Sequence, residues 1–260
     1  MTTATNSLSH TKSLSLVPAI ALVTFRQLLG RRRAVLLILL AAVPVLVAVL
    51  MRTAGVDDIN LAGGAILDRL MMAFILPIVA VLFGTAAFGS EIEDGTIVYL
   101  LAKPVARWAI VLAKLLAVTG AAIVLCVGSV LISSVIAIFW LGDEATQIAE
   151  AYFVAVAVGA ILYVAVFIAL SLYTRRALLI GFGYILIWEG ALASLLPGIR
   201  NLSVRQYAEG VGQAVATLPA SWGAYLTPGT AVPLSVILLV AAVALATRKL
   251  MRFEISGSGD

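Results

Sequence analysis

The stretch YFVAVAVGAILYVAVFIALSLY, residues 152–173, contains no charged side chain. A helix needs about 20 apolar residues to cross the hydrocarbon core of a bilayer, so this stretch is long enough for one crossing. Apolar residues lie on all its faces and do not alternate strictly with polar ones, which favours a helix over a strand of a membrane barrel. With five similar runs, the sequence predicts an all-α integral membrane protein with six transmembrane helices, at 34–51, 70–90, 115–140, 152–173, 177–199 and 231–251.

The composition also indicates a membrane protein. Hydrophobic residues make up 63% of the 260 residues and charged residues 12%, whereas soluble domains hold roughly 45 to 50% apolar and about 25% charged residues. The mean hydropathy is +1.14. We expect one six-span transmembrane domain over 16–260, a flexible cytoplasmic tail over 1–15, and no room for an attached ATPase domain.

The distribution of lysine and arginine predicts the orientation, because cytoplasmic loops carry an excess of these residues. If the N-terminus, the second and fourth loops and the C-terminus share one side, that side collects thirteen of the 17 basic residues. We therefore predict a multi-pass protein of the cell membrane with both termini in the cytoplasm, and we expect no nucleic-acid partner. The opposite side holds the remaining basic residues, Arg52, Arg69, Arg200 and Arg205.

The segment before the first run has two interpretations. Residues 1–15 are rich in Ser and Thr and lack the apolar region of a secretory signal peptide. Over 16–33, apolar residues such as Leu16 and Ile20 precede a basic end, which is typical of an amphipathic helix along the inner membrane surface. Alternatively, the arginines only hold the first span in its orientation.

Residues suited to catalysis or cofactor binding are scarce. His10 is the single histidine and Cys126 the single cysteine, which argues against a zinc site, a Cys/His nucleophile pair and a disulfide framework. The glycine-containing stretch 84–90 lacks the lysine of a phosphate-binding loop. We therefore predict no catalytic residue, no metal ligand and no cofactor bound by this chain.

The densest polar cluster, residues 88–108, lies between the second and third runs. Ser90 can cap the start of a short helix whose first turn holds Glu91, Glu93 and Asp94, at the positive end of the helix dipole. The cluster is either a docking helix for a cytoplasmic partner or an ordinary loop that satisfies the orientation rule. Basic residues follow that return positive charge to the membrane surface: Lys103, Arg107 and Lys114.

This cluster resembles the signature loop of the ABC type-2 permease family. The family pattern reads approximately E-x-x-x-G-T, then a leucine-rich stretch, then P-V-S-R and a lysine. The sequence carries Glu91 to Thr96, Leu100-Leu101, 104–107 and Lys114 in that order, with Ala106 in place of the usual serine. The six spans, the amphipathic start and the long segment before the last span resemble the same family.

The resemblance implies a transport subunit that has no ATPase site of its own and is paired in the membrane as a homodimer or with a similar permease. Two separate cytoplasmic ATPase subunits would bind ATP and Mg. A short helix joined to two spans would transmit the motion of these subunits to the spans within the lipid membrane. Since the family mainly exports, we expect an exporter. The ATPase-docking residues expected at or next to this coupling helix are Glu91, Glu93, Asp94, Gly95, Thr96 and Arg107.

The predicted external segment 200–230 is the other distinctive region. Tyr207 and Val211 recur at helical spacing while Arg205 and Glu209 lie elsewhere, which predicts an amphipathic helix in or dipping into the outer interface. The family resemblance implies short re-entrant helices near the exit, with an external gate formed by Tyr207, Trp222 and Tyr225. The alternative is an ordinary surface helix with an aromatic belt.

Glu189 is the one acidic residue well inside a predicted span, roughly 12 Å below its outer end at 1.5 Å per residue. An ionisable group at this depth is a candidate for the substrate pathway, or a hydrogen-bonded structural glutamate. Two functions of other classes remain alternatives to the transporter. One is a membrane-embedded lipid-processing enzyme that uses Glu189, and the other is a non-transporting anchor for a cytoplasmic complex.

Overall fold

The computed structural model of this protein describes residues 31–96, 106–142, 144–193, 198, 200–216 and 225–252. These residues form helices and turns, and no strand occurs among them. The all-α prediction is therefore confirmed for this part of the chain. The expected tail at 1–15 and the interfacial segment up to residue 30 lie outside it.

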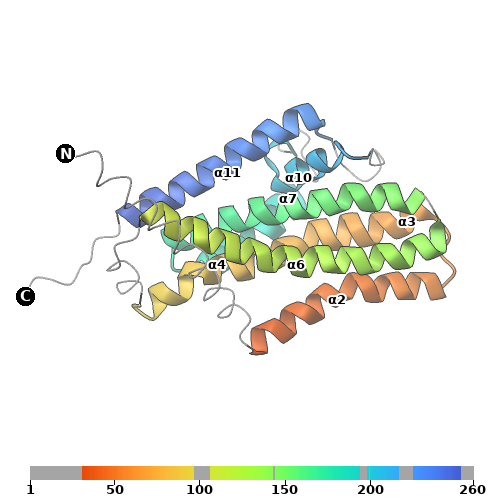
Figure 1. Cartoon of the computed structure of the whole chain (residues 1–260), viewed down its shortest axis with the longest axis horizontal. Coiled ribbons are helices and arrows are strands. Elements are labelled where there is room, and N and C mark those ends of the chain that lie inside the picture. The colour runs from red at the N-terminus through yellow and green to blue at the C-terminus, as the bar shows by residue number, and fades with distance from the viewer. Residues whose placement is uncertain are drawn as a thin grey trace, which may run out of the picture.

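The helices pack side by side in a bundle, and several consecutive helices join end to end (Figure 1). The elements α3, η1 and α4 form one continuous rod, and so do α8 and η2. The stretches η1 and η2 are wound as π-helix. In chain order the elements are α2 (Arg31–Thr53), α3 (Ile59–Gly63), η1 (Gly64–Ile75), α4 (Leu76–Glu93), α6 (Arg107–Leu141), α7 (Glu144–Tyr173), α8 (Ala177–Gly183), η2 (Tyr184–Leu192), η3 (Arg200–Leu202), α10 (Val204–Gly212) and α11 (Pro228–Met251).

Five of these rods are long and apolar enough to cross a membrane. Within the described residues the fifth predicted run appears as a shorter apolar helix, Ala177–Leu192, shorter than the about 20 residues that one crossing needs. Residues 194–197 and 199 of this predicted run lie outside the described part. Five spans are therefore supported by length and composition, and a sixth stays a prediction. The five candidate spans are Val35–Thr53, Ile59–Gly89, Arg107–Leu141, Ala145–Tyr173 and Pro228–Met251.

The second span begins earlier than predicted. The sequence placed its start at residue 70, after the charged residues Asp68 and Arg69, but the helix begins at Ile59. The Asp58 side chain accepts a hydrogen bond from the Asn60 backbone N–H and caps this start. Asp68 does not end the span, because it is buried inside the bundle and paired with a cation from another helix.

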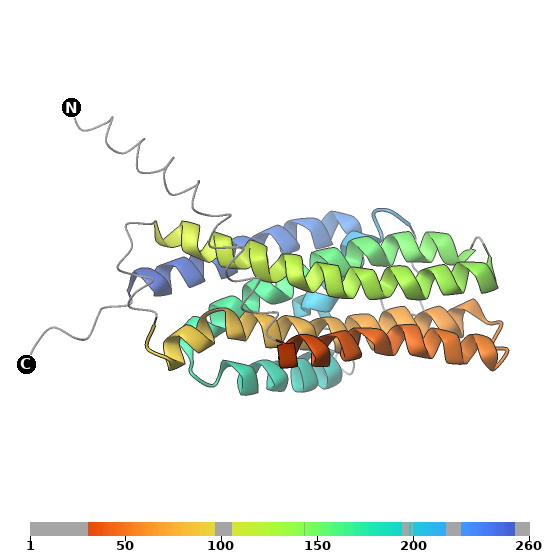
Figure 2. The same cartoon turned by 60° about the horizontal axis from the view of Figure 1, so that its bottom comes forward.

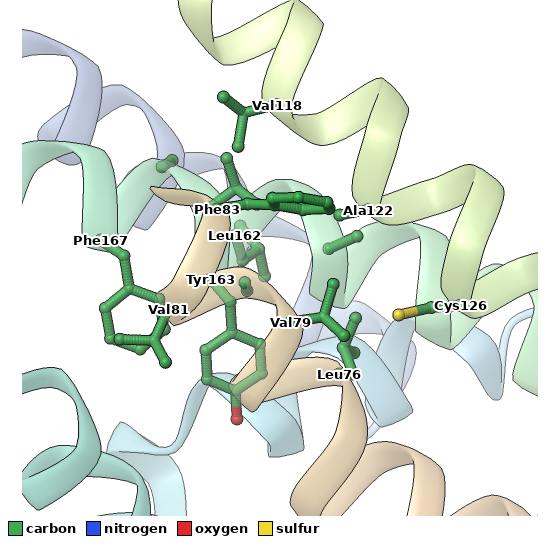
Figure 3. Close-up of a cluster of buried hydrophobic side chains, with 14 of the residues drawn as sticks. Leu76, Val79, Val81, Phe83, Val118, Ala122, Cys126, Leu162, Tyr163 and Phe167 are labelled. Atoms are coloured by element: carbon green, nitrogen blue, oxygen red, sulfur yellow. The ribbon is translucent and has the colours of Figure 1, made fainter. Parts of the chain in front are cut away.

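The helix α7, which contains the stretch 152–173, lies at the centre and packs against α4, α6, α10 and α11 (Figure 2). Its residue Phe167 is fully buried, as are Val118 of α6 and, nearly so, Phe83 of α4 (Figure 3). A Cβ added at Gly84 would lie 2.8 Å from the Phe167 Cβ, closer than real Cβ contacts. The glycine thus allows α4 and α7 to approach closely in the core.

The two ends of the bundle differ in charge. The last residues of α4, α7 and α11 and the first residues of α6 lie at one end (Figures 1 and 2). We call it the basic end, because it carries Arg107, Arg175, Arg176, Arg248 and Arg252. The opposite, acidic end carries Asp57, Asp58 and Glu150 together with Arg52. This separation agrees with the predicted orientation, while the cytoplasmic location of the basic end stays a prediction.

Candidate functional site

The predicted docking residues lie at the basic end, where α4 ends and α6 begins. Because α4 runs unbroken from Leu76 to Glu93, Ser90 lies within it, and the predicted helix start at Ser90 is wrong. Gly95 follows with a φ of +68°, a left-handed conformation that commonly ends helices. Glu91 and Glu93 therefore lie in the last turn of α4, Asp94 follows directly after it, and the connection at 97–105 lies outside the described residues.

The docking residues separate into an exposed and an inward-facing group. Asp94, Gly95 and Thr96 are exposed beyond the end of α4, and we call these three residues the tip. Glu91 instead faces the bundle and pairs with a lysine of α6. Arg107 begins α6 on the other side of the connection. The Glu93 side chain lies outside the part that the structure describes.

Lys114 is that lysine, and the structure buries it, although the sequence predicted a charge at the membrane surface. Only 1% of its surface is exposed. Its ammonium lies 2.7 Å from Glu91 Oε1, donates a hydrogen bond to the Ala87 carbonyl, and lies 4.3 Å from the centre of the Phe88 ring. All three partners belong to α4, so Lys114 ties α6 to α4 just inside the basic end.

A second group of charged side chains lies within the bundle, around α10. This short helix packs against α7 and α11, and its polar residues Gln206 and Glu209 are buried. A Cβ added at Gly212 would lie 2.5 Å from the Ala151 carbonyl oxygen of α7, and one at Gly210 would be equally crowded by α11. The small residues therefore let α10 insert among the spans, where a surface helix would have exposed its polar side.

Arg205 links α10 to the second span. Its guanidinium pairs with Asp68 of η1, and its Nε lies 2.6 Å from Glu209 Oε1. The Gln206 amide donates to the other oxygen of Glu209 at 3.1 Å, and the Tyr152 hydroxyl donates to Asp68 at 3.5 Å. Burial raises the pKa of Glu209 to about 8, and the neighbouring Arg205 opposes that rise. Two acidic side chains thus share one guanidinium in a buried site.

Glu189 holds the start of α10. Its carboxylate accepts hydrogen bonds from the Tyr184 hydroxyl at 2.9 Å, from the Ser203 hydroxyl at 2.5 Å and from the Val204 backbone N–H at 2.9 Å. A carboxylate in this place satisfies a free N–H of the first helical turn. These bonds favour the structural interpretation of Glu189, and its contact with a substrate stays a prediction.

The structure describes two of the three predicted gate residues. Tyr207 is buried, and its hydroxyl donates to the Asn201 carbonyl at 2.7 Å. Tyr225 is 56% exposed, and its backbone N–H donates to Gln206 Oε1 at 3.0 Å. Trp222 lies outside the described residues. The gate therefore stays a prediction.

An apolar cavity of about 290 Å³ lies near the basic end, between α2, α4, α7 and α8. Leu37, Phe83 and Leu178 line it, and the exposed Arg175 borders it. The Ser171 hydroxyl in its wall donates to the Ile168 carbonyl, so the wall is largely apolar. The size and the lining of this cavity suit a hydrocarbon chain. Four helices build this cavity, so single runs of sequence did not reveal it.

Several apolar spans with a continuous rod leading to an exposed polar tip define a multi-span membrane protein. A family model for ABC-2 family transporter proteins matches residues 27–188, more than half of the chain. The chain therefore belongs to the ABC-2 transporter family, and it is a membrane permease subunit. This confirms the predicted family. A comparison with curated proteins gave no match.

Proposed function

We propose that this permease works in an ATP-driven exporter and that a separate cytoplasmic ATPase docks at the connection between α4 and α6. The observation that carries the proposal is the exposed tip, Asp94 to Thr96, at the end of a rod that is continuous from Ile59. A helix transmits displacement along its axis, so movement of the tip would reach the far side of the membrane.

The complete transporter in this proposal contains two permease copies in the cell membrane and two ATPase subunits that bind ATP and Mg. The basic end then faces the cytoplasm, in agreement with the positive-inside rule. The cavity between α2, α4, α7 and α8 lies near the same end, and its apolar wall suits the hydrocarbon part of an amphipathic substrate.

The two alternative functions are less well supported. A lipid-processing enzyme would need a free acid or base, whereas the Glu189 carboxylate already accepts three hydrogen bonds within the protein. A membrane anchor that does not transport would share the docking tip. It is distinguished by the conformational response of the spans to ATP, which an anchor does not require.

The docking proposal is tested with a matched pair of glycine variants. Gly95 at the tip and Gly55 at the acidic end have φ of +68° and +71°, and a Cβ at either would meet nothing within 4 Å. Alanine therefore imposes the same backbone strain at opposite ends of the bundle, on the order of 1 kcal/mol. The tagged permease is purified from its native membrane, and the ABC ATPase that accompanies it is identified and assayed.

We expect the wild type and Gly55→Ala to retain the ATPase, and Gly95→Ala to lose most of it. The docking proposal is overturned if no ABC ATPase accompanies the wild type. It is also overturned if the two variants lose the ATPase to the same extent, because strain at the tip would then have no special effect.

A further inference from the structure

The docking connection joins two helices, and a single buried side chain ties them together just inside it. Lys114 lies seven residues into α6 from Arg107, or about 10 Å along the helix axis. Glu91 lies in the last turn of α4, directly before the tip. The Lys114–Glu91 contact of 2.7 Å therefore bridges the two helices close to the point where an ATPase would act.

The surroundings of Lys114 fix its ammonium from several directions. The Glu91 carboxylate, the Ala87 carbonyl and the face of the Phe88 ring each attract a cation, and each comes from α4. We call these three groups the α4 seat. Because hydrogen bonds and ring contacts are directional, the seat defines the position of α6 along α4 more precisely than apolar packing would.

Stability alone does not account for a charge in this place. An apolar pair of similar volume often replaces a buried ion pair with no loss of stability. The Lys114 side chain is 2% exposed and that of Glu91 is 22% exposed, so the lysine is withdrawn from water almost completely. A costly directional contact below the connection is better explained by a requirement for a fixed register between the two helices.

We propose that Lys114 and the α4 seat form a clamp that makes α4 and α6 move as one body when the connection between them is displaced. Lys114 and Glu91 are then positioning residues for energy transfer, and the exposed tip makes the contact with the ATPase. The clamp rests on the proposed docking of an ATPase at this connection. Without the clamp, displacement of the tip would move the α4 rod and leave α6 behind.

The test replaces both charged partners at once. In Glu91→Met/Lys114→Met the pair becomes apolar with similar volume, so the helices stay packed but lose the directional contact. Each labelled protein carries two spin labels, one of them at Val240→Cys on α11 as the reference. The other is at Leu61→Cys, which reports the far end of the α4 rod, or at Phe139→Cys, which reports the far end of α6. All three positions are exposed, and the native Cys126 is buried. Labelled permease is mixed with excess unlabelled permease, so that each distance is measured within one chain.

Distances are measured in the ATPase complex with and without ATP. In the otherwise wild-type complex we expect ATP to change both the 61–240 and the 139–240 distance. In the double variant we expect the ATPase to remain bound and the 61–240 change to persist, while the 139–240 change falls by at least half. The matched control is Lys249→Met, which removes a lysine that lies 5.4 Å from the Tyr173 ring and does not touch the α4–α6 contact. Both changes should persist in this control.

The outcomes separate the clamp from the docking proposal. If no ATPase accompanies the unaltered permease, the proposed docking fails and the clamp fails with it. If the ATPase binds but the 139–240 distance does not respond to ATP, or responds equally in the double variant, the clamp alone is overturned. If the double variant does not fold, Glu91→Asp keeps the charge, shortens the side chain by one methylene, and is subject to the same criterion.

Discussion

Replacing Arg205 by methionine tests whether the buried charges around α10 act as one group. The change removes the guanidinium that Asp68 and Glu209 share and keeps most of the side-chain volume. The Asp68 side chain is 8% exposed and that of Glu209 is fully buried, so water cannot replace the lost partner. Breaking a buried ion pair by removing one partner typically costs about 3 to 5 kcal/mol.

The single cysteine provides the assay. Cys126 is fully buried beside α4 and α7 (Figure 3), so a thiol-reactive fluorescent maleimide labels it only when the bundle opens. Since each 1.4 kcal/mol is a factor of ten in an equilibrium constant, a loss of about 3 kcal/mol raises the open population by about 100-fold. We expect Arg205→Met in detergent to be labelled faster by a factor of that order.

A second variant shows whether the loss of stability comes from the unpaired charges or from the lost packing of the arginine side chain. In Asp68→Asn/Arg205→Met/Glu209→Gln every charge is removed while the shapes are nearly kept, so most of the lost stability should return. Labelling of Arg205→Met at less than five times the wild-type rate would refute the role of the ion pairs. A triple variant no more stable than Arg205→Met would show that packing of the arginine stem, and not charge, sets the cost.

Two further predictions concern Glu209 and the core. The pKa of Glu209 is raised from an ordinary value of 4.5 to about 8, so between these values the folded state binds more protons than the unfolded state. Stability should therefore fall as pH rises from about 5 to 8, and Glu209→Gln should reduce this slope in the labelling assay; an unchanged slope would contradict the assignment. Gly84→Ala should lower the free energy of unfolding by about 1 to 3 kcal/mol, because the added methyl overpacks against Phe167. The control Gly128→Ala, with nothing within 4 Å of its added Cβ, should be close to neutral in thermal unfolding. Equal effects of the two variants would rule out the close α4–α7 contact.

Local sequence predicted the membrane helices well, because the free energy of placing a residue in lipid depends mainly on its own side chain. The stretch 152–173 lies within the central helix, and the family pattern at 88–108 identified the family. The same reasoning misplaced the start of the second span, because Asp68 reads as a residue of a loop. A local pattern cannot show that Arg205, far along the chain, accompanies Asp68 into the bundle.

The candidate site was predictable only in part. Gly95 was recognised as part of the family pattern, and the structure gives it a left-handed backbone just after the end of α4. Ser90, in contrast, looked like a helix cap, because the preceding apolar helix gives no sign in its sequence that it continues through Glu93. The roles of Glu91 and Glu189 depended on partners from other helices. The helix α10 was expected near the outer interface, and its glycines permit contacts that place its polar residues inside the bundle.

The amino-acid sequence by itself thus determined that this protein crosses the membrane several times, roughly where most of the spans lie, and to which family the chain belongs. These properties follow from hydrophobicity summed over consecutive residues and from a short ordered motif. Only the tertiary structure decided which charges are paired. Lys114 and Arg205 look like surface residues in the sequence, and each is stabilised in the bundle by a carboxylate from another helix. The cost of burying a charge depends on its neighbours in space, and a sequence pattern does not contain them.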